Sequence, residues 1–278
     1  MDKLKRVIKH LWDIIGKEEM RILPGNLAFF LVLSAIPIIT LLGLLASMFS
    51  ISVSTVIEFM TDTFPKEVSD LLVPFISGNG FDVNILTFMT IGFFLASNGP
   101  HSIIIASDTV YGIEPDDLLS RRIKSLFLTI LLVNLFIFIL IVLAFGNNIV
   151  ATLLNMKILQ SLSSDLYHIF VLLKWPVAFI LIFFTIKLLY TVAPDKKIPS
   201  KYMNRGAIFT TLGWMVITAI YSYYVSHFAS YDIFYGGLSN IIIMMMWIYI
   251  LSYILVIGIA INANTYQAIM EQTKHKEN

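Results

Sequence analysis

Apolar residues gather into six blocks, each about as long as a helix that crosses a lipid bilayer. The blocks cover about residues 27–49, 83–105, 124–146, 169–190, 206–228 and 237–262. A bilayer core of about 30 Å needs roughly 20 apolar residues in helical form. Only 13% of the 278 residues are charged, well below the charged fraction of soluble domains. The sequence therefore predicts an all-α, polytopic membrane protein with six transmembrane helices.

The positive charges predict how these helices are oriented. All but three of the 19 lysines and arginines fall on one side of a six-span chain, the exceptions being Lys66, Lys157 and Lys174. Because cytoplasmic loops carry the excess of basic residues, we expect both termini in the cytoplasm. Residues 1–26 would form a cytoplasmic amphipathic leader, 27–264 the membrane domain and 265–278 a cytoplasmic tail. The leader shows no signal-peptide cleavage site, so the first span is expected to stay as an anchor.

The external segment, about residues 50–82, contains an amphipathic pattern. In the stretch PKEVSDLLVPFI, apolar residues recur at helical spacing: Val68, Leu71, Leu72, Phe75 and Ile76. Polar residues take the other face: Lys66, Glu67, Ser69 and Asp70. We expect a helix on the outer surface or in the mouth of the bundle, where it either packs down a loop or guides an amphiphile.

The first two spans carry helix breakers, so we expect transmembrane helices 1 and 2 to be kinked or broken. Pro37 follows Ser34 in the first span and leaves the carbonyl of Leu33 without its helical partner. The second span meets SNGPH at Ser97–His101, and Asn, Gly and Pro in sequence break helices. Membrane proteins tolerate such breaks where they pack in protein or face water, and transporters build substrate sites from them. Proline kinks without any such role are also common, so both interpretations remain open.

Motifs of known enzymes are missing. The chain has no cysteine and five histidines in separate segments, and it contains no HExxH, no Gly-x-Ser-x-Gly and no phosphate-binding glycine loop. We therefore expect no catalytic residues, no metal and no cofactor. A net charge of +1 gives no indication of a nucleic-acid partner.

Neutral polar side chains are the candidate site residues. They are Ser34, Pro37, Asn98, Gly99, Pro100, Asn134, Tyr235, Asn240, Trp247 and Asn262. On the last span Asn240, Trp247 and Asn262 share one helical face, which suits either helix-to-helix hydrogen bonds or a substrate path. A moderately polar groove with few buried charges suits a lipid headgroup better than a bare ion. Asp108 is the candidate carboxylate for an ion or proton carrier.

Several motifs together resemble the YihY/BrkB family of bacterial inner-membrane proteins, once labelled ribonuclease BN. They are LAFFLVLSAIPII, SDTVYGIE followed by paired arginines, LLYTVAPDKKIP before RGAIF, and YGGLSNIIIMMMWIYI. The resemblance implies six helices in the bacterial cytoplasmic membrane. Family members have been linked to serum resistance, to transport of lipids or lipopolysaccharide precursors, and to cation–proton exchange.

One position departs from the family pattern. The family usually ends its last helix with Gly-Ala-Glu-x-Asn, and this chain keeps Gly258 and Asn262 but has Ala260 in place of the carboxylate. A mechanism that relies on that carboxylate is not expected here.

The sequence thus predicts a multi-pass inner-membrane transporter or flippase of a lipid-like amphiphile, with membrane lipids as its partners. A cation–proton exchanger that uses Asp108 is one alternative. A non-transporting scaffold for envelope enzymes is another. Neither an enzyme nor a ribonuclease is expected.

Overall fold

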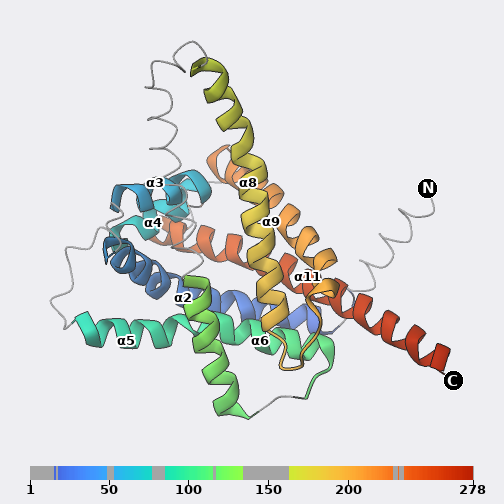
Figure 1. The fold of residues 1–278 in the computed structure, drawn as a ribbon. Coiled ribbons are helices and arrows are strands. Elements are labelled where there is room, and N and C mark those ends of the chain that lie inside the picture. The colour runs from blue at the N-terminus through green and yellow to red at the C-terminus, as the bar shows by residue number, and fades with distance from the viewer. Residues whose placement is uncertain are drawn as a thin grey trace.

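A computed structural model describes residues 18–48, 53–76, 85–114, 117–133, 163–227 and 235–277, with Gly16 and Tyr231. Within these residues every regular element is a helix, which confirms the all-α prediction for this part of the chain (Figure 1). The elements are α2 (Glu19–Met48), α3 (Val53–Thr63), α4 (Lys66–Ile76), α5 (Ile85–Ala96), α6 (Asn98–Tyr111), a helix over residues 118–133, α8 (Ser163–Val192), η2 (Ser200–Met203), α9 (Asn204–His227), η3 (Gly236–Leu238) and α11 (Ser239–Glu277).

Among the described residues, two helical segments are long and apolar enough to cross a membrane, Ser200–His227 and Ser239–Met270. Only 22% and 44% of their apolar windows are buried inside the protein. The core helix of a soluble protein would be mostly buried, so these apolar surfaces favour a lipid environment. Met20–Ala35 and Pro176–Val192 are shorter apolar helical segments. Most of the predicted third span lies outside the described residues.

α2 and α11 are longer than the first and last predicted spans. α2 begins at Glu19, ahead of the predicted start at residue 27, and continues through both Pro24 and Pro37. α11 runs to Glu277, beyond the predicted end at residue 262. Glu, Met, Arg, Gln and Lys at these ends are good helix formers, so the helices continue past their apolar parts.

Two clusters of buried apolar residues hold the helices together. The first joins α2, α6, α8, α9 and α11 and includes Leu27, Ile104, Tyr190, Ala207 and Leu255. The second joins α3 and α4 to α2, α9 and α11 and includes Met60, Val68, Tyr221 and Trp247. α11 takes part in both clusters, and in Figure 1 it runs from beside α3 and α4 to the opposite end of the protein.

α4 confirms the amphipathic pattern predicted within residues 50–82 at Val68 and Leu72, with one correction, and the side chains of Phe75 and Ile76 lie outside what the structure describes. Val68 and Leu72 are 0% and 3% exposed, as their spacing predicts. Ser69, predicted on the polar face, is only 1% exposed. Its hydroxyl donates to the carbonyl of Met60 in α3 at 3.0 Å, so the contact between the two helices buries a polar residue that spacing places outside.

Candidate functional site at a helix break

The predicted second span is interrupted at its helix breakers. α5 ends at Ala96 and α6 begins at Asn98, with Ser97 between them, and the two helices follow one another end to end (Figure 1). Pro100 is the third residue of α6. A proline is tolerated there because the first amide groups of a helix have no acceptor within it. Asn98, Gly99 and Pro100 therefore form the first turn of the second half-helix.

Ser34 of α2 hydrogen-bonds to the backbone at this break. Its hydroxyl accepts a hydrogen bond from the Gly99 amide at 2.9 Å and donates to the carbonyl of Phe30 at 2.7 Å. In an unbroken helix the Gly99 amide would donate to Leu95, whose carbonyl lies 3.4 Å from the same hydroxyl. A Cβ on Gly99 would lie 3.1 Å from the side chain of Leu31, so the glycine permits the close approach.

Arg122 of helix 118–133 also hydrogen-bonds to residues on both sides of the break. Its Nη1 donates to the Asn98 side-chain oxygen at 2.9 Å, and its Nη2 donates to the Phe94 carbonyl at 2.9 Å. The guanidinium also lies over the Phe94 ring, 3.8 Å from its centroid, in a cation–π contact. The break therefore adjoins a cation, where the sequence predicted neutral polar groups alone.

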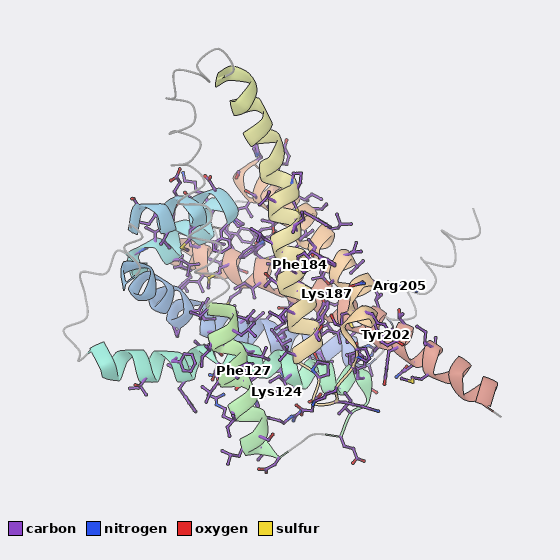
Figure 2. The ribbon with its side chains drawn as sticks, in the orientation of Figure 1. Lys124, Phe127, Phe184, Lys187, Tyr202 and Arg205 are labelled. Carbon is purple, nitrogen blue, oxygen red and sulfur yellow. The ribbon has the colours of Figure 1, made fainter. Side chains whose placement is uncertain are left out.

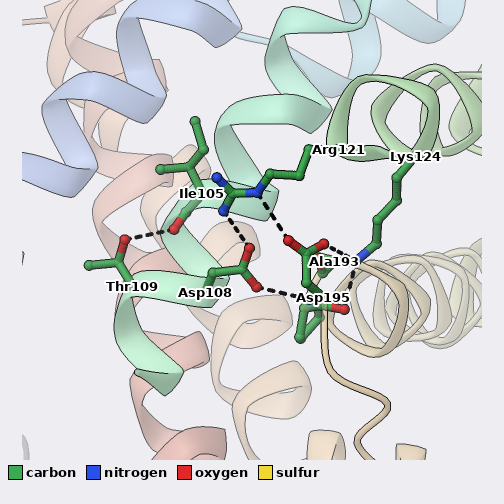
Figure 3. Close-up of polar contacts among 8 residues, drawn as sticks. Ile105, Asp108, Thr109, Arg121, Lys124, Ala193 and Asp195 are labelled. Atoms are coloured by element: carbon green, nitrogen blue, oxygen red, sulfur yellow. Dashed lines mark hydrogen bonds and ion pairs between the residues drawn. The ribbon is translucent and has the colours of Figure 1, made fainter. Parts of the chain in front are cut away.

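Next to Arg122 lies a network of four charged side chains (Figure 3). Arg121 pairs with Asp108 of α6 at 2.5 Å and with Asp195, in the segment after α8, at 3.0 Å. Lys124 pairs with the second oxygen of Asp195 at 2.8 Å. The Asp195 amide donates to Asp108 at 2.8 Å. Two cations and two carboxylates thus join α6, helix 118–133 and the chain after α8.

The network fixes the end of α8 to the start of helix 118–133. Lys124 Nζ also donates to the carbonyls of Ala193 and Pro194 at 2.8 and 2.7 Å (Figure 3). The side chains of Asp108 and Asp195 are each only 3% exposed. Since each buried carboxylate faces a cation, its charge is compensated within the network.

The two carboxylates differ in their affinity for protons. Burial raises the pKa of the Asp108 carboxyl above its usual value, although the Asp195 amide and Arg121 act against this. Burial acts in the same direction on Asp195, but its contacts with Lys124, Asp108 and Arg121 act against it and leave the pKa of that carboxyl lowered. Asp108 is therefore the member of the pair that takes up a proton first.

Asn262 packs in a second polar contact, between α8, α9 and α11. Its side-chain oxygen accepts a hydrogen bond from the Gly206 amide at 2.7 Å. A Cβ on Gly206 would lie 2.1 Å from the carbonyl oxygen of Gly258. The backbones of α9 and α11 are therefore in close contact at this point. The buried hydroxyl of Tyr190 lies 2.6 Å from the Thr210 hydroxyl and donates to a carbonyl of α11.

The other candidate residues lie apart from the break. Trp247 donates to the Thr218 hydroxyl at 3.3 Å and packs against Phe64, with ring centroids 5.4 Å apart. Tyr235 is 49% exposed, and Asn240 is half-buried. Asn134 lies outside the described residues. The structure therefore brings Ser34 together with Asn98, Gly99 and Pro100, one helical turn from Pro37, while Trp247 and Asn262 contact α9.

The sequence marks Arg121, Arg122, Lys124 and Asp195 only as loop charges or as parts of a motif. Paired arginines after Asp108, with another aspartate in a later loop on the same predicted side, were the signal for the network. No sequence feature indicated the buried hydroxyl of Tyr190. Among the described residues, no group of three or more His, Asp or Glu side chains could hold a metal ion.

Comparison with known proteins identifies relatives across the chain. A profile of the family described as Virulence factor BrkB matches residues 11–278. YfkH of Bacillus subtilis, named a putative ribonuclease-like protein, is 27% identical over 261 residues, which cover 92% of this chain and 94% of YfkH. A UPF0761 membrane protein of Vibrio campbellii is 24% identical over 264 residues, covering 92% of this chain and 80% of the relative.

A shorter match leads to the same group. A UPF0761 membrane protein of Haemophilus influenzae is 32% identical over 96 residues, 34% of this chain and 35% of its own. No solved structure matches. The resemblance drawn from the sequence motifs is confirmed by the family profile.

Proposed function

The chain belongs to the Virulence factor BrkB family of membrane proteins, and we propose that it is a bacterial inner-membrane transporter or flippase of a lipid-like amphiphile. The break between α5 and α6 carries this proposal. At that point the Gly99 amide and the Phe94 carbonyl bond to the side chains of Ser34 and Arg122 on two other helices. Transporters use discontinuous helices of this kind to place polar groups at membrane depth.

Six passes with both termini in the cytoplasm are part of the proposal. Charges of the described residues support it: α3 and α4 carry four acidic residues and Lys66, whereas basic residues gather at the other end. The latter include Arg121, Arg122, Lys124, Lys187, Lys196, Lys197, Lys201 and Arg205. An excess of lysine and arginine marks the cytoplasmic side.

Exposed phenylalanines near this basic end support a lipid-facing apolar surface beside it. Figure 2 shows Phe127 with Lys124 on helix 118–133, and Phe184 with Lys187 on α8. The two phenylalanines are 57% and 58% exposed. The first turns of helix 118–133 lie close to the end of α8, since Lys124 contacts the carbonyl of Ala193 directly after α8. On both helices the lysine therefore lies on the side of the phenylalanine nearer the basic end, so the exposed apolar surface gives way to basic residues there.

The path that we propose follows the outer flank of the break. Ser34 and Ser97 are 0% exposed, so the inner side is closed by packing. On the outer side Phe94 and Leu95 are 52% and 44% exposed beside Arg122. A headgroup would lie at the polar break while its acyl chains stay against these side chains. Cation–proton exchange is less well supported, because Asp108 is already bonded to Arg121 and to the Asp195 amide.

Reconstitution of the full chain tests the proposal. Vesicles with and without protein would carry fluorescent lipid on one leaflet and a pH-sensitive dye inside. We expect protein-dependent lipid movement between leaflets while the pH gradient persists. Collapse of the gradient without lipid movement would favour the exchanger, with Asp108→Asn as its first test. No movement of either kind would favour the non-transporting scaffold.

A further inference from the structure

We propose that Arg122 binds the phosphate headgroup of an anionic membrane lipid on the outer flank of the break between α5 and α6. This inference names a substrate class for the site described above and rests on the proposed transport function. It follows from the contrast between two adjacent arginines, from the donors that Arg122 keeps, and from the apolar side chains around it.

Arg121 and Arg122 have opposite surroundings. Arg121 pairs with two carboxylates, Asp108 and Asp195. Arg122 has neutral partners, the side chain of Asn98 and the carbonyl of Phe94, and among the described residues it makes no ion pair. Burial also lowers the pKa of the Arg122 guanidinium. A partly buried cation without an anion is unfavourable, so an anionic ligand would be stabilised there.

The guanidinium keeps donors for such a ligand. Arginine has five N–H groups in a planar fork that suits two oxygens of one phosphate. Nη1 and Nη2 of Arg122 each use one hydrogen, toward Asn98 and Phe94. Nε is buried and has no partner in the described part of the chain. One hydrogen on each Nη atom therefore remains for an anion, while the two existing bonds hold the plane of the group.

Exposed apolar side chains surround this cation. On α5, Ile91 and Phe94 are 56% and 52% exposed, and on helix 118–133 Leu119 and Ile123 are 66% and 59% exposed. Leu119 and Ile123 lie within one turn of Arg122, and Ile91 lies one turn before Phe94. A free phosphate ion gains nothing from these side chains. An anionic lipid uses both features, since its phosphate meets Arg122 and its acyl chains cover the apolar flank.

Lipid binding to the purified full chain in detergent is the direct test. Native mass spectrometry would follow phosphatidylglycerol and phosphatidylcholine, offered in equal amounts to the wild type, to Arg122→Gln and to Arg205→Gln. Arg205 is the matched control, an exposed arginine at the start of α9. We expect the wild type and Arg205→Gln to prefer phosphatidylglycerol, and Arg122→Gln to bind it about tenfold more weakly, the effect of one charge-assisted contact.

Three results would overturn the inference: equal binding of both lipids by the wild type, unchanged phosphatidylglycerol binding by Arg122→Gln, or displacement of the lipid by inorganic phosphate alone. If Arg122→Gln does not fold, the lipid preference of the wild type still decides, together with Arg122→Lys, which keeps the charge but not the planar fork. Scrambling of both labelled lipids separates the two proposals. Equal movement of both, unaffected by Arg122→Gln, removes this inference and leaves transport standing, whereas selective binding without movement removes transport alone.

Discussion

The hydroxyl of Ser34 and the amide of Gly99, 65 positions apart, share a hydrogen bond of 2.9 Å. A side chain of α2 thereby takes the place of a main-chain acceptor in the second span. Both residues are buried. Within a bilayer an unpaired amide is costly, so this contact lets the chain break a helix without exposing its backbone to lipid. It also fixes α2 against the start of α6.

Replacement of Ser34 by alanine should therefore destabilise the protein. The Gly99 amide would lose its acceptor while staying buried, which costs about 1–3 kcal/mol. Ser226→Ala is the control, because Ser226 is exposed and bonds only to the carbonyl of Ser222 one turn earlier. Thermal unfolding in detergent would compare the two variants. Equal unfolding temperatures would contradict the role given to Ser34.

Two glycines should respond in opposite ways to alanine. A Cβ on Gly206 would lie 2.1 Å from the Gly258 carbonyl oxygen, so α9 and α11 would have to separate. A Cβ on Gly92 of α5 would meet nothing within 4 Å. We expect Gly206→Ala to cost about 1–3 kcal/mol or more by overpacking. Gly92→Ala should gain up to about 1 kcal/mol from the helix preference of alanine. Thermal unfolding measures both, and a stable Gly206→Ala variant would contradict the close contact.

The sequence predicts the local features of this structure well. The interruption after Ala96 follows from Asn98, Gly99 and Pro100, whose effect on a helix depends only on their own backbone chemistry. The same holds for the buried positions of Val68 and Leu72, which follow from helical spacing.

The sequence does not predict contacts between separate helices, because these depend on how the helices pack. The bond from Arg122 to Asn98 joins two residues that no local pattern relates. Ser69 is buried for the same reason, since its partner is the carbonyl of Met60 in another helix. Asn262 shows the intermediate case: its helical face was predicted, but not its contact with the Gly206 amide.

The ion network predicts a pH dependence of stability. The lowered pKa of Asp195 means that its charged form is favoured by folding. Its contribution is fully present above the ordinary aspartate pKa of about 4 and is lost as the pH falls through the lowered value. At pH 7, Asp195→Asn should destabilise the protein by about 3 kcal/mol, the lower end for breaking a buried pair, because Lys124 is 23% exposed.

Thermal unfolding of wild type and Asp195→Asn over a pH series would check this dependence. The gap between them should narrow as the pH falls below about 4, because the unfolded wild type takes up a proton there while folded Asp195 keeps its charge down to its lowered pKa. Asp117→Asn is the control, because Asp117 is exposed just before helix 118–133 and asparagine caps a helix as well as aspartate does. A gap that stays constant with pH would mean that the charge of Asp195 is not what the network uses.

The two prolines of α2 allow a test of whether a bend at Pro37 serves transport. Pro37 lies one turn after Ser34 and frees the carbonyl of Leu33, a residue that is 51% exposed. Pro24 lies in the first part of the same helix and is buried. A proline inside a helix costs about 3 kcal/mol, so alanine at position 37 should straighten and stabilise α2. If the bend serves transport, Pro37→Ala will unfold at a higher temperature and yet move labelled lipid several-fold more slowly, while Pro24→Ala keeps its rate. Equal rates in the two variants, with Pro37→Ala more stable, would show that the bend has no part in transport.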